Sequence, residues 1–250
     1  MSVLDDLGAE QARLETILNG LDEAQWMSPS GAAGWTVADV VLHLAQSEES
    51  VVDVVAGRDL LASSGTVAGS TAGGTVGERV DDLVRAERGA APGLVFGRWQ
   101  RARRDAMAAL RAADPDRPVG WVTGPVKPAT LATTRLAEHW AHGLDITGPL
   151  ALEFPDTERL RHVAWLAHRT LPYAMTVAGE QPAEVWCELS APDGTSVWQF
   201  GRPEAESAIA GAAGEFCRVA AHRLSAAQSR LRATGPHGAA ALRLLRTYAE

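Results

Sequence analysis

Apolar residues recur with a helical period along most of residues 1–150. The first 21 residues form such a stripe, with Gln11 as its one polar gap, and this pattern predicts an amphipathic helix. A second helix is predicted from about Val37 to Val55, because Thr36 and Asp39 have the spacing of a capping box at its start. Three further stretches have the same period: residues 76–87, 92–113 and 129–146.

The segment between the second and third predicted helices has a different composition. Residues 57–75 contain many glycine, serine, threonine and alanine residues and no aromatic residue. Small residues without an apolar period favour irregular structure, so we expect a mobile loop here.

The pattern of the chain changes near residue 150. Residues 156–171 keep a helical period, which predicts one more helix. Residues 185–189 and 196–200 are short apolar runs on either side of a Pro-Asp-Gly turn at residues 192–194, and this is typical of two strands. Residues 205–249 combine small residues with helical spacing.

These patterns predict an α+β protein with two domains. An all-α bundle over residues 1–149 is followed by a smaller α+β domain over residues 150–250. The chain of 250 residues is 46% hydrophobic and 22% charged, which is ordinary for a folded protein with a sizeable core.

Charge and cysteine content narrow the classes of function. The formal net charge is −8, and a protein that binds nucleic acid needs a basic surface, so we expect no nucleic-acid partner. Cys187 and Cys217 are too few for a disulfide framework, which favours a reducing, cytoplasmic environment. The sequence contains neither a signal peptide nor an apolar run of ~18 residues, so we expect no membrane partner. A small-molecule substrate remains, and both a monomer and a homodimer are compatible with the sequence.

Three residues of the predicted bundle have side chains that bind divalent metals. Glu138 and His142 are four residues apart and project from the same face of a helix. His43 lies in an apolar stretch of the second predicted helix, and a bundle can bring it opposite that pair. Two histidines and one carboxylate leave coordination positions open, which is typical of catalytic metal sites. A chance surface pair and a hydrogen-bonded core histidine are the simpler alternatives.

Two segments of the chain resemble a known family. Residues 34–44, GWTVADVVLHL, resemble the signature of the mycothiol-dependent maleylpyruvate isomerase family, which belongs to the DinB-like metal-binding bundle superfamily. Residues 138–145, EHWAHGLD, resemble the second metal motif of that family. The resemblance places His43, Glu138 and His142 at the metal-ligand positions. It extends to an uncharacterised actinobacterial branch of metal-binding proteins.

The resemblance also implies a fold and a chemistry. It implies an up-and-down four-helix bundle followed by a sterol-carrier-like domain, in which Arg223 aligns with an active-site arginine. The metal, zinc first and nickel, iron or manganese as alternatives, would hold the thiol cofactor mycothiol as a thiolate for isomerisation or S-transfer. A thiol-independent lyase, cyclase or hydrolase and a non-catalytic binding protein remain open.

The second motif contains residues whose roles the sequence leaves open. His139 projects roughly 100° away from Glu138 around the helix, so we interpret it as non-ligating. Asp145 suits either a solvated helix end or a contact with one of the metal-binding side chains. His222 lies beside Arg223, so it is either a structural residue or part of the site. A run of arginines can contact an anionic cofactor or form a solvated helix face: Arg98, Arg101, Arg103 and Arg104.

Overall fold

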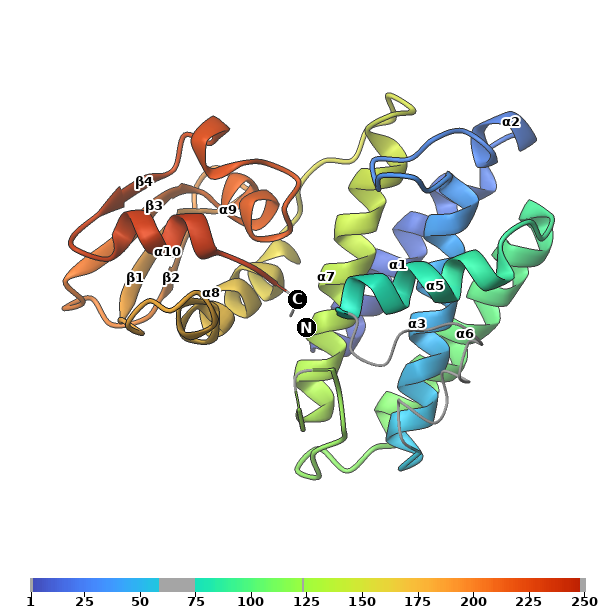
Figure 1. The fold of residues 1–250 in the computed structure, drawn as a ribbon, viewed down its shortest axis with the longest axis horizontal. Coiled ribbons are helices and arrows are strands. Elements are labelled where there is room, and N and C mark those ends of the chain that lie inside the picture. Colours follow the sequence, from blue (N-terminus) through green and yellow to red (C-terminus); the bar gives the residue numbers. More distant parts are fainter. Residues whose placement is uncertain (1, 59–74, 123, 248–250) are drawn as a thin grey trace. The chain divides into compact units, whose positions relative to one another are not determined.

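The computed structural model describes residues 2–58, 75–122 and 124–247. Within them the chain divides into two compact units, of which the first ends at Phe154 and the second begins at Pro155. Figure 1 shows that the first unit is helical and that the second contains a sheet. Nearly all of the predicted loop at residues 57–75 lies outside the described residues.

Four long helices form the first unit. α3 packs most extensively on α6, and α1 packs on α7, while contacts of α3 with α7 and of α1 with α6 close the bundle. Two shorter helices, α2 and α5, contact α3. The predicted bundle is therefore confirmed. The helices are α1 (Val3–Asn19), α2 (Glu23–Trp26), α3 (Val37–Val55), α5 (Val76–Glu87), α6 (Pro92–Ala112) and α7 (Pro128–Thr147).

Local sequence signals set the start of each of these helices. The predicted capping box of α3 is present, because Thr36 Oγ1 accepts a hydrogen bond from the Asp39 amide at 3.2 Å and Asp39 Oδ2 accepts one from the Thr36 amide at 2.9 Å. α6 and α7 each begin with a proline, whose fixed φ suits the first helical turn. Equivalent boxes begin three other helices, at Ser2, Asp22 and Thr75.

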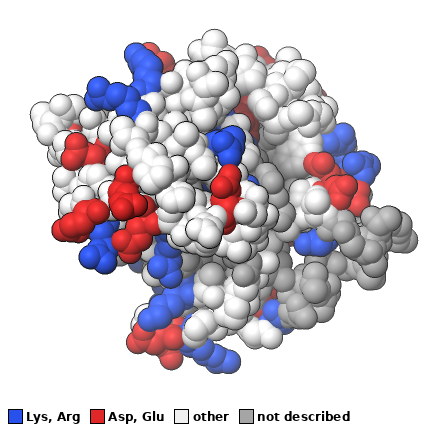
Figure 2. Space-filling view, turned by 60° about the vertical axis from the view of Figure 1, so that its left-hand side comes forward, with Lys and Arg blue, Asp and Glu red and all other residues white. Residues whose placement is uncertain are grey.

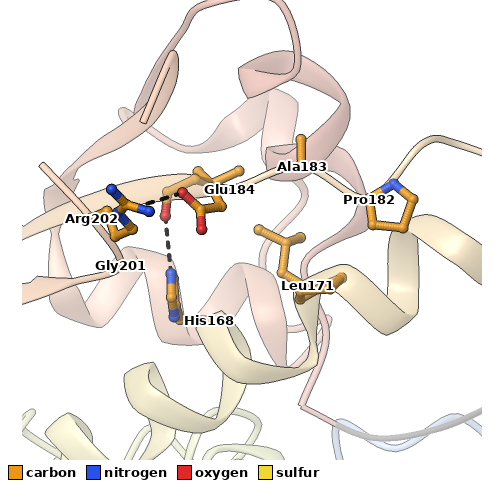
Figure 3. Close-up of a pocket in the computed structure, with 9 residues that line it drawn as sticks. His168, Leu171, Pro182, Ala183, Glu184, Gly201 and Arg202 are labelled. Atoms are coloured by element: carbon orange, nitrogen blue, oxygen red, sulfur yellow. Dashed lines mark hydrogen bonds and ion pairs between the residues drawn. The ribbon is translucent and has the colours of Figure 1, made fainter. Parts of the chain in front are cut away.

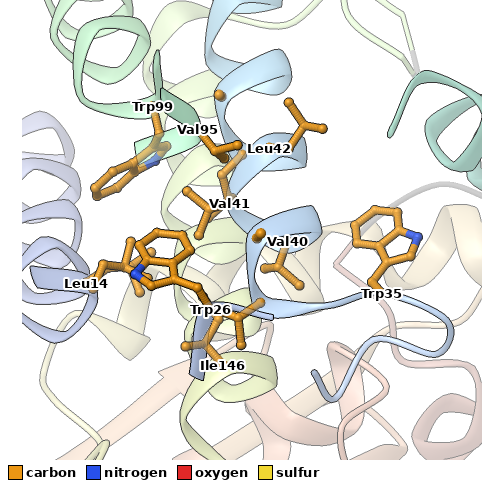
Figure 4. Close-up of a cluster of buried hydrophobic side chains, with 14 of the residues drawn as sticks. Leu14, Trp26, Trp35, Val40, Val41, Leu42, Val95, Trp99 and Ile146 are labelled. Atoms are coloured by element: carbon orange, nitrogen blue, oxygen red, sulfur yellow. The ribbon is translucent and has the colours of Figure 1, made fainter. Parts of the chain in front are cut away.

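The core of the bundle is built around the first half of α3. Val40, Val41 and Leu42 are buried, and Figure 4 shows them beside Trp26 and Trp99. Such large, fully buried side chains each contribute about 1.5–3 kcal/mol of transfer free energy. The burial of these side chains therefore fixes the position of α3 in the bundle.

The second unit is a four-stranded sheet with helices. The strand order is β2-β1-β3-β4, in which β1 pairs antiparallel with β2 and parallel with β3, and β3 pairs antiparallel with β4. Alternate residues of β1 are buried, and α8, α9 and α10 contact the sheet. Its elements are α8 (Leu160–Val177), β1 (Val185–Ser190), β2 (Val197–Phe200), β3 (Ser207–Ala212), α9 (Ala213–Ala220), β4 (Arg232–Thr234) and α10 (Gly238–Leu244).

The α+β class is confirmed, but three details of the second unit differ from the prediction. α8 begins at Leu160 rather than at residue 156. α8 continues beyond residue 171 through Pro172 to Val177, because Ala174 and Met175 on its last turns are fully buried and their burial outweighs the lost hydrogen bond. The strands β3 and β4 were not predicted. Apart from Ile209, β3 consists of small residues with little strand propensity, and pairing with β1 stabilises it.

Two further observations concern the surface and the helix lengths. On the face shown in Figure 2, acidic and basic side chains lie close to one another rather than in separate areas of one sign. Among the described residues, none of the helices has the length and apolar character needed to cross a membrane.

Gly143 provides a test of the packing of α7. A Cβ atom at Gly143 would lie 2.5 Å from Cζ of Phe154, and the guanidinium of Arg13 covers that ring at 3.7 Å. We therefore expect Gly143→Ala to lower the free energy of unfolding by about 1–3 kcal/mol, measured by urea denaturation.

The matched control is Gly97→Ala in the interior of α6, where the nearest atom to an added Cβ is Arg101 Nη1 at an ordinary 3.5 Å. Gly97→Ala should raise the free energy of unfolding by about 0.5–1 kcal/mol, because alanine has less backbone freedom than glycine in the unfolded chain. Shifts of the same sign for both variants would contradict the packing described for Gly143.

Candidate functional site

His43, Glu138 and His142 lie together where α3 contacts α7. Nε2 of His43 and Nε2 of His142 are each 3.4 Å from Oε2 of Glu138. One potential ligand atom from each residue lies within 4.8 Å of the others. Tetrahedral ligands about 2.0–2.1 Å from zinc are about 3.3–3.4 Å apart, so the two measured separations fit a zinc-sized cation.

The cluster is partly open to solvent. The side chains of His43 and His142 are 12% and 11% exposed, whereas that of Glu138 is 29% exposed. The helix spacing explains why Glu138 and His142 share a face, and the packing of α3 on α7 supplies His43 from 95 residues away. A cation held there would keep an accessible side.

Asp145 orients the ring of His142. Nδ1 of His142 donates a hydrogen bond to Oδ2 of Asp145 at 2.9 Å, and Asp145 is buried. This contact leaves the lone pair of Nε2 directed at the cluster. The amide of Gly31 donates to the carbonyl of Asp145 at 2.7 Å, and a Cβ atom at Gly31 would lie only 3.0 Å from Oδ1 of Asp145. Glycine at position 31 thus permits the close approach of the two backbones, which fixes the main chain of Asp145 beside His142.

Trp35 forms an aromatic wall beside both histidines. Its ring centroid lies 5.3 Å from that of His43 and 6.3 Å from that of His142, and it is stacked on the latter. Its Nε1 donates a hydrogen bond to Oδ1 of Asp81 on α5 at 3.0 Å. Sequence reasoning did not assign Trp35 to the site, although it belongs to the same GWTV segment that precedes His43.

The electrostatics of the cluster suit a metal-binding donor set. Burial alone would raise the pKa of Glu138, but its contacts with His142 and His43 hold that pKa well below the usual value. Burial lowers the pKa of His43 despite the neighbouring carboxylate. Burial opposes the protonation of His142 as well, but Asp145 and Glu138 raise its pKa. Glu138 is therefore ionised and His43 neutral at physiological pH.

His139 is a core residue with both ring nitrogens engaged. Nδ1 donates to the carbonyl of Arg135 at 2.8 Å, and Nε2 accepts a hydrogen bond from Nε1 of Trp99 at 3.2 Å. The side chain is fully buried, and this burial, together with the charge of Arg135, lowers the pKa of His139 to about 3. His139 is thus neutral, and neither nitrogen faces the cluster.

Arg223 belongs to the second unit, which is described by itself. Its amide donates to the carbonyl of Arg218 at 2.8 Å and its Nη1 to that of Ala221 at 2.6 Å. His222 has a left-handed φ of 58° and forms the turn that ends α9. The structure brings together the three predicted ligands, while the catalytic role of Arg223 stays a prediction.

Two members of the arginine run pair with carboxylates of the bundle. Nε and Nη2 of Arg98 donate to the two carboxylate oxygens of Glu49 at 2.7 and 2.8 Å, and Arg98 also pairs with Glu87. Arg103 pairs with Glu15. Arg98 and Arg103 therefore tie helices together, whereas Arg101 and Arg104 are exposed, as expected of a solvated helix face.

The second unit contains a cavity of about 300 Å³, shown in Figure 3. Its wall includes Leu171 and Val185, and Nε2 of His168 donates a hydrogen bond to the Val185 carbonyl at 3.0 Å. Glu184 and Arg202 lie at its rim, 3.9 Å apart. None of the predicted site residues lines this cavity.

The family is decided by a match over the helical unit. Residues 7–147 match the model of the mycothiol maleylpyruvate isomerase N-terminal domain, which covers more than half of the chain and all three clustered residues. The chain belongs to this family. Uncharacterized proteins from two strains of Mycobacterium tuberculosis are each 32% identical to it over 220 residues, which is 87% of this chain and 84% of theirs.

The fold of this family member is that of a solved enzyme. A crystal structure of the mycothiol-dependent maleylpyruvate isomerase aligns with a TM-score of 0.61 and 16% identity, covering 94% of this chain and 92% of the other. A histidine-to-alanine mutant of the same enzyme aligns with a TM-score of 0.59 and 16% identity, covering 93% and 91%. At this identity the likeness establishes the shared fold.

The hydrogen bond between Trp99 and His139 can be tested by removing its donor. Trp99→Phe leaves Nε2 of His139 buried without a donor, so we expect the free energy of unfolding to fall by about 1–3 kcal/mol from this bond, in addition to the smaller ring. Urea denaturation measures the change. Trp26→Phe, a buried tryptophan of the same core, controls for ring size. An equal loss in both variants would argue against the hydrogen bond.

Proposed function

We propose that the protein is a divalent-metal-dependent enzyme that acts on a small metabolite with the help of a thiol, as an isomerase or an S-transferase. The observation that carries the proposal is the pair of 3.4 Å separations from Glu138 to His43 and His142, in a cluster that stays partly open. Membership of the mycothiol maleylpyruvate isomerase family supports the thiol. We propose the bundle over residues 1–149 as the metal-binding domain and residues 150–250 as the second domain.

Each residue of the site has a proposed task. His43, Glu138 and His142 hold the cation, and Asp145 keeps His142 in the orientation that presents Nε2. When bound, the metal, zinc first and nickel, iron or manganese as alternatives, stabilises a thiolate such as that of mycothiol at neutral pH. Arg223 is proposed to hold a carboxylate or enolate oxygen of the substrate through its guanidinium.

Metal content tests the ligand set. We expect the wild-type protein to bind one equivalent of Zn²⁺ and His43→Ala to lose it, because two ligands on one helix hold a cation far more weakly than three. Elemental analysis after gel filtration measures the ratio of metal to protein. His168→Ala, in the second unit, is the control and should keep the full equivalent.

Asp145→Asn should weaken metal binding without abolishing it. Loss of the carboxylate charge beside Nδ1 of His142 should weaken Zn²⁺ binding about 10–100-fold, measured by competition with a chelator, without changing the stoichiometry at saturation.

For the first variant, full metal content in His43→Ala would rule out the proposed ligand set.

The thiol requirement is tested with the substrates that the family name suggests. We expect the Zn²⁺-loaded protein to consume maleylpyruvate, or to conjugate an electrophile such as chlorodinitrobenzene, only when mycothiol is present. Arg223→Ala should lower the rate about a hundredfold, as loss of a transition-state contact does. Cysteine serves as the control thiol. Turnover of either compound without any thiol would instead favour a metal-dependent lyase, cyclase or hydrolase.

A further inference from the structure

A buried ion pair lies in the bundle next to the candidate metal cluster. Nε of Arg135 donates to Oε1 of Glu48 at 3.0 Å, and the two side chains are 3% and 0% exposed. Arg135 precedes Glu138 by three residues on α7, and Glu48 follows His43 by five on α3. The pair therefore bridges the same two helices as the cluster.

Stability does not account for this pair. Removing two charges from water costs several kcal/mol each, and apolar residues of similar volume commonly serve a core equally well or better. The pairing is also incomplete: in the described part of the chain, Nη2 of Arg135 and Oε2 of Glu48 are buried and have no hydrogen-bond partner. A forked contact would have satisfied both atoms. The two side chains therefore share one hydrogen bond, and each keeps a buried polar atom that the other does not satisfy. We therefore consider what the two charges do to the groups around them.

The positive end of the pair acts on the cluster. Arg135, Glu138 and His142 occupy positions i, i+3 and i+7, which form one stripe along α7. Residues three apart on a helix have Cβ atoms about 5–6 Å apart, so Arg135 and Glu138 are direct neighbours on this face of α7.

The other charged groups around Glu48 are accounted for. On α7, Nδ1 of His139 lies 3.6 Å from Oε1 of Glu48, but His139 is neutral. Burial, and after it the neighbouring carboxylate of Glu138, raise the pKa of Glu48, whereas the contact with Arg135 lowers it. On α6, Arg103 also acts on Glu48, but it forms its own ion pair with Glu15. The pair is thus a dipole in a medium of low polarity, and its cationic partner Arg135 lies on the face of α7 that carries Glu138 and His142.

We infer that the buried Glu48–Arg135 pair makes the metal site prefer anionic ligands over neutral ones at its open coordination position. This inference rests on the proposed function, because it concerns the ligand that a bound cation accepts. The positive charge of Arg135, one helical turn from Glu138, lowers the free energy of an anion that binds at the site, while it leaves a neutral ligand nearly unaffected. A thiolate would be favoured over a thiol for the same reason. Arg135 is accordingly a positioning residue that acts through charge.

The test compares an anionic with a neutral probe on Co²⁺-loaded protein. Azide and imidazole both change the visible spectrum of Co²⁺, so their dissociation constants are obtained by titration. Glu48→Met with Arg135→Met removes the dipole and preserves the volume of the core. We expect the azide affinity of this variant to fall about tenfold and its imidazole affinity to change less than twofold.

Two further variants keep the test decisive. Arg135→Lys retains the charge and should keep azide affinity within threefold of wild type, even if the double variant fails to fold. Glu49→Met with Arg98→Met removes another ion pair from α3 and α6 and should leave both affinities unchanged. Unchanged azide affinity in the first double variant, or equal changes for both probes, would overturn the inference. Failure of wild-type protein to bind Co²⁺ would instead refute the proposed function.

Discussion

The carboxylate of Glu138 is shared between two imidazole rings that reach it from different helices. This contact requires α3 and α7 to pack in one register, since a shift of one helical turn would move His43 about 5.4 Å along its axis. The register is set by apolar burial on α3 and by the capping box at Thr36 and Asp39. The site thus depends on the same forces that fold the bundle.

The interior between α3 and α7 is unusually polar for a helical bundle. Glu48, Arg135 and His139 are all buried beside the cluster, although each charged or polar group must be desolvated to lie there. Trp99 satisfies one nitrogen of His139, and the carbonyl of Arg135 satisfies the other. A polar interior of this kind supports the site proposed beside it.

Family membership and fold limit the function without fixing the reaction. The chain shares its fold with the mycothiol-dependent maleylpyruvate isomerase at 16% identity, and the relatives at 32% identity are uncharacterized. One scaffold supports many chemistries because the reaction is decided by the residues around the site. In this chain those residues include Trp35, which contacts both histidines, and Asp145, which holds His142.

Local patterns were sufficient for most of the fold and for two of the three residues of the cluster. The apolar period predicted α5 at its observed bounds and, together with the capping box at Thr36, did the same for α3, while helical spacing alone placed Glu138 and His142 on one face. Tertiary packing decided the rest. Burial extended α8 through Pro172, pairing with β1 made a strand of β3, and the contact of α3 with α7 brought His43 to the pair. A single sequence records periodicity and turn chemistry directly, whereas contacts between distant residues depend on the packing of whole elements.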